Sequence, residues 1–291
     1  MEIKEMNVLV AMDMSPMDEA LIKYVGIACK FYPLMKFTFL NNIKLSELPS
    51  EYKTAIKLER IAQSINEKID EMISEAGTVP QGYKIEVSAM NFTETAFLNV
   101  SKKINAELAI VGNKQRLTGG GGMARKLIRM WQIATLLVPE TFNEKPKKII
   151  QAVDFSRYTS RINLVSQHII QYNRLGIQKT DPVYVSKVSW QFFPGPGEKE
   201  IRKIIEEDTR TKKTRWLKEY PENEPLIVLP STEKSIATTL AEYINDQRVD
   251  LVIMGVLGVS SLTGLFLGSV SNELINQESN ACILLVRRIA P

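Results

Sequence analysis

The pattern of strand and helix signals in this chain occurs twice, and this repeat is the feature that most limits its fold. A strand-like run ends at Asp13, and another ends at Asp154. A later apolar run in each half ends at a glycine, Gly112 or Gly255, so the spacing from aspartate to glycine is 99 residues in one half and 101 in the other. A repeat of about 140 residues indicates a duplicated domain, because solenoid repeats are only about 20–50 residues long.

In each half, strand-like runs alternate with helical segments. Strands separated by crossover helices favour a parallel sheet with right-handed connections and helices on both faces. We therefore expect an α/β protein of two repeated doubly wound domains, each an open five-stranded parallel sheet of order 3-2-1-4-5 with helices on both faces. The polar segment Thr141–Lys148 is interpreted as a linker, and the expected domains are residues 1–142 and 147–291.

Apolar periodicity and capping residues predict the individual elements. In the first half we expect strands at residues 7–12, 35–42, 83–90, 108–111 and 133–138, and helices at 17–31, 51–76 and 93–104. In the second half we expect strands at 148–153, 182–188, 226–229, 251–254 and 281–286, and helices at 156–174, 198–219 and 235–245.

Composition excludes several classes of protein. The chain is 44% hydrophobic and 24% charged, which is typical of a soluble globular protein, and no run approaches the roughly 18 apolar residues of a membrane span. The N-terminal sequence lacks a signal-peptide pattern, and Cys29 and Cys282 are expected to be buried thiols in a reducing compartment, so we expect a cytoplasmic location. A net charge of +4 is small for this length and gives no expectation of nucleic-acid binding. The single histidine, His168, has no neighbouring ligands, so neither a metal site nor a Ser–His–Asp arrangement is expected.

A glycine-rich loop follows the fourth expected strand of the second half. Two residues separate Gly255 from Gly258, and nine more lead to Gly268 and Ser269, where a helix is expected to begin. Glycines let the backbone approach an anion closely, and the free N–H groups at a helix start favour negative charge. Glycines after a strand are also ordinary turn formers, so the spacing alone leaves both interpretations open.

Side chains near this loop could complete an anion or nucleotide site. The hydroxyls of Ser269 and Ser271 can hydrogen-bond to phosphate oxygens. Asp154, at the end of the first strand of the same half, only accepts hydrogen bonds when ionised, and it suits ribose hydroxyls or an adenine amine. An Asp-x-Ser sequence after a strand is also a common helix cap.

With these motifs, both halves resemble the universal stress protein family, and the chain resembles a tandem member. The second half has the full spacing of Gly255, Gly258, Gly268 and Ser269, the segment AVDFS from residue 152, and the apolar final run ACILLVRR. The resemblance implies the open five-stranded fold and binding of ATP, or of AMP or ADP, with or without Mg²⁺.

The resemblance also implies a role for each site residue. Asp154 would hold the ribose or adenine side, Val188 would pack on adenine, and Met254 would line the base pocket. The residues around the phosphates would be Gly255, Gly258, Gly268, Ser269, Val270 and Ser271.

The first half departs from this pattern. Gln115 stands in place of the second glycine, and Arg125 and Lys126 stand in place of Gly–Ser. The favoured interpretation is a degenerate half that keeps the fold and has lost the nucleotide. In the alternative, a slipped loop binds an anion with the help of Lys114 and Arg116.

The resulting hypothesis is a stress-response or regulatory protein that binds an adenine nucleotide in its C-terminal half. Two alternatives are a slow ATPase or nucleotidyl-transfer enzyme, for which no positioned general base is evident, and an interaction scaffold without a nucleotide. The family resemblance further implies that the two halves pair as an internal pseudo-dimer through the final runs 133–138 and 281–286, and it leaves open a homodimer of the whole chain.

Overall fold

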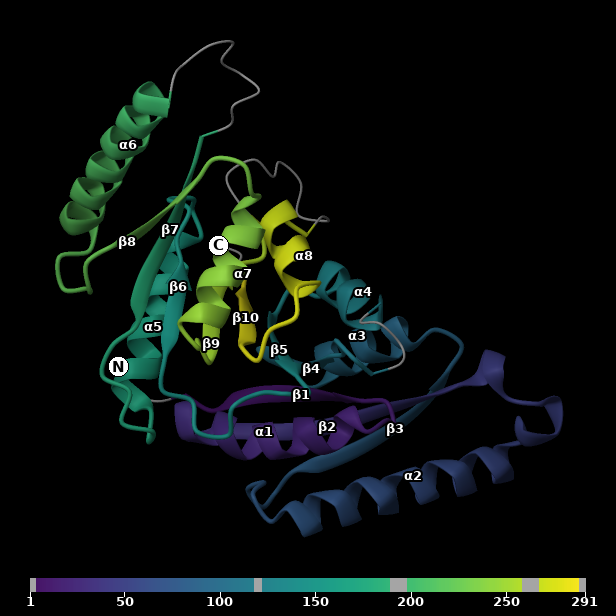
Figure 1. Ribbon diagram of the computed structural model, residues 1–291. Coiled ribbons are helices and arrows are strands. Elements are labelled where there is room, and N and C mark those ends of the chain that lie inside the picture. The colour runs from purple at the N-terminus through teal and green to yellow at the C-terminus, as the bar shows by residue number, and fades with distance from the viewer. Residues whose placement is uncertain (1–3, 118–121, 189–197, 258–266, 288–291) are drawn as a thin grey trace. The chain divides into compact units, whose positions relative to one another are not determined.

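A computed structural model describes residues 4–117, 122–188, 198–257 and 267–287 of the chain. The chain divides into two compact units, one of residues 1–145 with 172–175 and the other of residues 146–171 with 176–291. Each unit is an α/β domain with five parallel strands (Figure 1). None of the helices in the described ranges is long and apolar enough to cross a membrane.

The first unit has five parallel strands in the order β3-β2-β1-β4-β5. Helices α1 and α2 contact each other, as do α3 and α4, and the right-handed connections place the two pairs on opposite faces of the sheet (Figure 1). The elements are β1 (Met6–Met12), α1 (Met17–Phe31), β2 (Met35–Lys44), α2 (Ala55–Ala76), β3 (Lys84–Met90), α3 (Thr93–Lys103), β4 (Leu108–Asn113), α4 (Gly122–Met130) and β5 (Ala134–Pro139).

The second unit repeats this topology with the strand order β8-β7-β6-β9-β10. The predicted order 3-2-1-4-5 is therefore confirmed. The elements are β6 (Ile149–Ala152), α5 (Thr159–Tyr172), β7 (Asp181–Lys187), α6 (Glu198–Glu219), β8 (Ile227–Ser231), α7 (Ile236–Asp246), β9 (Leu251–Gly255), α8 (Ser269–Ile275) and β10 (Cys282–Val286).

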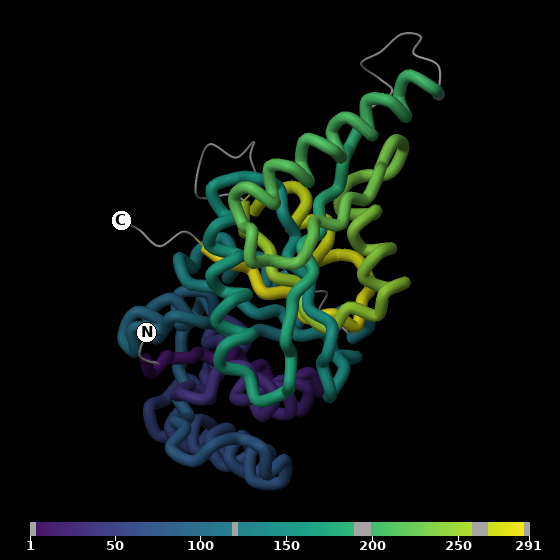
Figure 2. Tube along the Cα trace, turned by 90° about the vertical axis from the view of Figure 1, so that its left-hand side faces the viewer, coloured from purple at the N-terminus to yellow at the C-terminus, as the bar shows by residue number. Residues whose placement is uncertain are grey.

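The helices of the second unit cover both faces of its strands. Helix α6 packs on β7 and β8 from one face, and α7 packs on the same strands from the other face, beside α8 (Figures 1 and 2). Chain order reverses between the neighbouring strands β6 and β9. In doubly wound sheets, ligands bind at the carboxyl ends of the strands on either side of this reversal.

The turn after the first strand has the same geometry in both units. Its aspartate accepts a hydrogen bond from the N–H group two residues ahead, at 3.2 Å for Asp13 and 2.9 Å for Asp154. The residue between them has a positive φ in each case, 60° at Met14 and 55° at Phe155. A non-glycine residue rarely adopts this backbone conformation, so its recurrence shows that the repeat extends to the detail of the turn.

Candidate functional site

A cavity of about 430 Å³ lies in the second unit, at the carboxyl ends of β6, β7 and β9. Helix α7 forms one side of it, and the start of α8 forms another. This is the switch point at which a doubly wound sheet is expected to bind its ligand. Its described lining residues are Ala152, Val153, Asp154, Val183, Tyr184, Val185, Lys187, Ile236, Leu240, Met254, Gly255, Leu257, Gly268, Ser269, Val270 and Ser271.

The structure brings most of the residues singled out from the sequence to this cavity. Seven of those nine residues line it, and they come from three separate parts of the chain. Gly258 lies outside the described residues. Val188 is absent from the described lining. The seven are Asp154, Met254, Gly255, Gly268, Ser269, Val270 and Ser271.

Val188 has a different position from the one expected, because β7 ends one residue earlier, at Lys187. Side chains alternate between the faces of a strand, so Val183, Val185 and Lys187 share the face of the cavity. The N–H group of Val188 instead donates to the carbonyl oxygen of Ser231 at 3.0 Å and continues the pairing with β8. The valines that form the apolar wall are therefore Val183 and Val185.

One side of the cavity is apolar. Val183 and Val185 of β7, Ile236 and Leu240 of α7, and Met254 of β9 contribute to it. Such a surface suits a flat apolar or aromatic group, with polar groups at its margin to fix the orientation.

Asp154 supplies a carboxylate at the end of β6. Its Oδ1 atom accepts a hydrogen bond from the N–H group of Ser156 at 2.9 Å, which fixes the side chain within the turn. An ionised carboxylate can accept about four hydrogen bonds, so this contact leaves acceptor capacity for a ligand hydroxyl or amine.

The start of α8 presents backbone N–H groups at the cavity. Gly268 has φ −58° and ψ 148° and lies just before the helix, where its N–H group donates to Val256 O at 2.9 Å. Hydrogen bonding along the helix begins with Asn272, whose N–H group donates to Gly268 O at 2.8 Å. The N–H groups of residues 269–271 therefore have no acceptor within the helix, and they suit an anionic oxygen.

The hydroxyl of Ser271 has a structural role that differs from the expected one. It is buried and donates to the carbonyl oxygen of Gly255 at 2.9 Å, so it fastens α8 to the end of β9. Since a hydroxyl has a single proton to donate, the N–H group of Ser271 is the donor left for an anion.

Crowding, and not a positive φ, accounts for the glycine at position 255. Neither Gly255 nor Gly268 has a positive φ. A Cβ atom on Gly255 would lie 2.9 Å from Cβ of Tyr158, closer than such atoms approach in folded proteins. In the first unit, Gly112 is crowded in the same way by the side chain of Met17.

Sequence reasoning missed the polar residues that β7 contributes. Lys187 lines the cavity, and its Nζ atom donates to the carbonyl oxygens of Thr232, at 2.9 Å, and Lys234. Burial is the main cause that raises the pKa of Tyr184 to about 12, and the nearby carboxylates of Asp208 and Asp154 contribute to the same shift. The two-residue period that joins Lys187 to Val183 and Val185 is the signal that could have identified the lysine.

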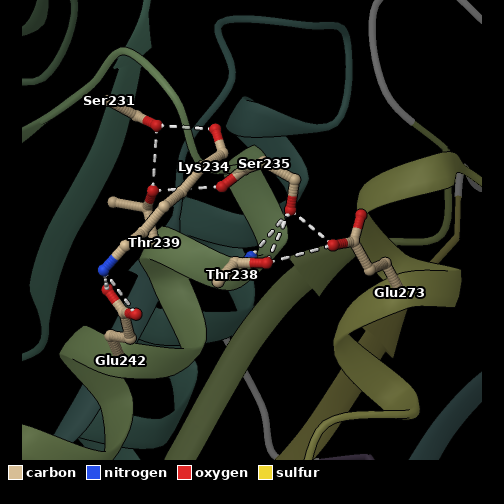
Figure 3. A network of polar contacts seen from close by, with 7 residues as sticks. All are labelled: Ser231, Lys234, Ser235, Thr238, Thr239, Glu242 and Glu273. Carbon is tan, nitrogen blue, oxygen red and sulfur yellow. Dashed lines mark hydrogen bonds and ion pairs between the residues drawn. The ribbon is translucent and has the colours of Figure 1, made fainter.

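A hydrogen-bond network holds together the two helices beside the cavity (Figure 3). The carboxylate of Glu273 on α8 accepts hydrogen bonds from the hydroxyls of Ser235 and Thr238 at the start of α7, the latter at 3.2 Å. The Ser235 hydroxyl also caps α7 by accepting from the N–H group of Thr238 at 3.0 Å. Because α7 carries apolar lining residues and α8 carries the N–H groups, this network fixes two walls of the cavity relative to each other.

Residues 147–286 match the model of the Universal stress protein family. The second half of the chain belongs to this family. The cavity therefore lies within a universal stress protein domain. Within the described ranges, no group of three or more His, Cys, Asp and Glu side chains is arranged to hold a metal ion.

Solved structures extend the likeness in fold to the whole chain. A universal stress protein from Archaeoglobus fulgidus DSM 4304 is 17% identical, with a TM-score of 0.67, and the match covers 97% of this chain and 98% of that chain. A functionally unknown protein from Pseudomonas aeruginosa PAO1 is 12% identical, with a TM-score of 0.60, and the match covers 97% of this chain and 92% of that one. No curated protein matches the sequence. At these identities the structures show a shared fold over nearly the whole length of the chain.

Proposed function

We propose that the second half binds ATP or a related adenine nucleotide and that the protein is a nucleotide-responsive member of the stress-response family. The observation that carries this proposal is the convergence of Asp154, the end of β9 and the start of α8 on one cavity. Its volume of about 430 Å³ lies within the range of small-molecule sites, about 300–1,000 Å³.

The chemistry of the walls matches the three parts of a nucleotide. The apolar side formed by β7 and α7 would receive the adenine ring. Asp154 would accept hydrogen bonds from ribose hydroxyls or from the adenine amine. The N–H groups of residues 269–271 would bind phosphate oxygens, and Mg²⁺, where it accompanies the nucleotide, would be held chiefly by the phosphates and water.

The corresponding cavity of the first half is much smaller, about 80 Å³, and its described lining includes Phe97. This volume is below the range given above for small-molecule sites. We therefore assign the nucleotide to the second half.

Binding, and not turnover, is the function that the lining supports. Its described residues include neither histidine nor cysteine. The Lys187 ammonium is engaged by two backbone carbonyls. A regulatory role, in which the nucleotide changes the stability or the surface of the domain, follows from such a site.

The test is a titration of the full chain with ATP, ADP and AMP, with and without Mg²⁺, followed by calorimetry and by thermal unfolding. We expect Asp154→Ala to weaken binding about tenfold or more, since hydrogen bonds to a charged group contribute about 1.5–3 kcal/mol. Asp13→Ala, the matched change in the first half, should leave the affinity unchanged. Equal affinity in wild type and Asp154→Ala, or no binding of any of the three nucleotides, would overturn the proposal.

A further inference from the structure

Glu140 lies directly after β5 in the first half, and its carboxylate is bound by the loop that follows β4. The N–H group of Arg116 donates to Oε1 at 2.7 Å. The N–H group of Gln115 lies 3.2 Å from both carboxylate oxygens. Consecutive N–H groups of one loop therefore converge on a single anionic side chain, as they do in sites that bind free anions.

The charge of Glu140 is stabilised by these contacts. Burial alone would raise the pKa of the carboxyl, but hydrogen bonds from the N–H groups of Arg116, Glu140 itself, Gln115 and Leu117 outweigh burial and lower the pKa. The loop thus favours the ionised form, which is the form that resembles a phosphate oxygen in charge and in acceptor capacity.

The repeat relates this loop to the glycine-rich loop that follows β9 in the second half, which the sequence predicts to lie beside the phosphates. Gly112 pairs with Val138 in the first sheet, and Gly255 pairs with Val286 in the second, so the two registers match. Three residues after the glycine, the first half has Gln115 where the second half has a glycine. Two residues after Val138 the first half has Glu140, whereas two residues after Val286 the sequence has an arginine, which lies outside the described residues.

The aspartate of the first half is also occupied. The ammonium of Lys114 forms an ion pair with the carboxylate of Asp13. The corresponding position in the second half is Leu257, which cannot form such a pair with Asp154. Lys114 therefore neutralises Asp13, which is the counterpart of Asp154, the carboxylate proposed to bind the ribose.

We propose that the carboxylate of Glu140 takes the place of a phosphate by binding the N–H groups of the loop after β4 in the first half. This half therefore stabilises its loop without a nucleotide. The loop is a latent anion site, and withdrawal of the carboxylate opens it to inorganic phosphate. The comparison with a phosphate site rests on the proposed function of the second half, but the contact between Glu140 and the loop does not.

Amide hydrogen exchange in the full chain tests the proposal without any nucleotide. Glu140→Ala should raise the exchange rates of the Gln115 and Arg116 amides about tenfold or more, because these N–H groups lose a charged acceptor. Glu144→Ala, which removes an exposed carboxylate four residues away, should leave both rates unchanged. Unchanged rates in Glu140→Ala would overturn the proposal.

Inorganic phosphate is the probe for the latent site. Added to Glu140→Ala, it should restore slow exchange at Gln115 and Arg116, whereas sodium chloride at equal ionic strength should not. Failure of phosphate to restore slow exchange, or equal restoration by chloride, would overturn the proposal. Phosphate bound in the second half does not affect this readout, so the result is independent of whether that half binds nucleotides.

Discussion

At the scale of single residues, the sequence predicts which residues lie at the cavity but not the physical reason why each residue is there. Asp154 and Gly255 are both located at the cavity, as their spacing in the sequence predicts. The reason for the glycine could not be predicted, because it depends on Tyr158, which lies nearly 100 positions earlier in the chain and approaches only in the folded domain. The strand-end error at Val188 has a similar cause, since a shift of one residue reverses the face on which a side chain lies.

Asp18 gives the stability of the first unit a pH dependence. Its carboxyl is fully buried and accepts hydrogen bonds from the N–H groups of Asp13, at 3.1 Å, and Met14, at 2.7 Å. Burial is the main cause that raises its pKa from 3.8 to about 7; the charge of Asp13 also raises it, while the hydrogen bonds and Lys114 lower it. A carboxyl whose pKa is raised on folding favours the folded state when protonated. Its contribution is therefore complete below about pH 4 and is lost as the pH rises to about 7.

Asp18→Asn should remove this dependence. Between pH 4 and pH 7 the free energy of unfolding of the wild-type first unit should fall relative to the variant by about 3 kcal/mol, since each pKa unit corresponds to about 1.4 kcal/mol and the pKa of Asp18 is raised from 3.8 to about 7. Urea unfolding at a series of pH values measures it. Glu19→Gln, an exposed neighbour on α1, is the control and should follow the wild type. Parallel curves for Asp18→Asn and the wild type would contradict this explanation.

At the scale of elements, the sequence predicts the sheets better than the walls of the site. The central strands are buried apolar runs, such as Val8–Val10 and Leu251–Met254, and their order follows from the crossover helices. Helix α2 begins at Ala55, four residues later than expected, because residues 50–52 form a short 3₁₀ turn. The network that joins α7 to α8 could not be predicted, because Ser235 and Glu273 are 38 residues apart and no sequence pattern connects them.

Leu240 of α7 corresponds to Phe97 of α3. After each helix the chain donates a hydrogen bond back to its last turn, from the N–H group of Ala106 to Ser101 O and from that of Val249 to Ile244 O, and this equivalence makes Phe97 the counterpart of Leu240. Both residues line the cavity of their own unit. Leu240→Phe should therefore reduce nucleotide affinity at least tenfold, because the ring would occupy space assigned to adenine.

Stability provides the check on this variant. A ring that enters an existing cavity avoids most of the overpacking cost of about 1–3 kcal/mol, so the unfolding midpoint should change little. Leu217→Phe is the matched control on the exposed face of α6 and should bind like the wild type. Calorimetry and urea unfolding measure both properties, and full affinity in Leu240→Phe would place the adenine elsewhere.

At the scale of the whole molecule, the duplication has kept the fold while the two sites have diverged. Both units keep the aspartate turn, the crowded glycine and the strand order. They differ at Lys114, Gln115 and Glu140. The ammonium of Lys114 pairs with Asp13, and the carboxylate of Glu140 accepts a hydrogen bond from the N–H group of Gln115. The loss of the glycine at position 115 is visible in the sequence. The carboxylate that takes the place of a ligand is not, because it comes from the end of another strand. The expected pairing of the two halves stays a prediction.

This divergence predicts that a nucleotide stabilises the two units unequally. A ligand at about 100 times its dissociation constant adds about 2.7 kcal/mol to the unfolding free energy of the unit that binds it. Amides of β9, such as Val252 and Ile253, are buried and exchange through unfolding of the second unit, so saturating ATP should slow them up to about 100-fold. Amides of β1, such as Leu9 and Val10, report on the first unit and should slow far less. Equal slowing in both strands would contradict the assignment of the nucleotide to the second half, which rests on the small cavity of the first half and its bound Glu140.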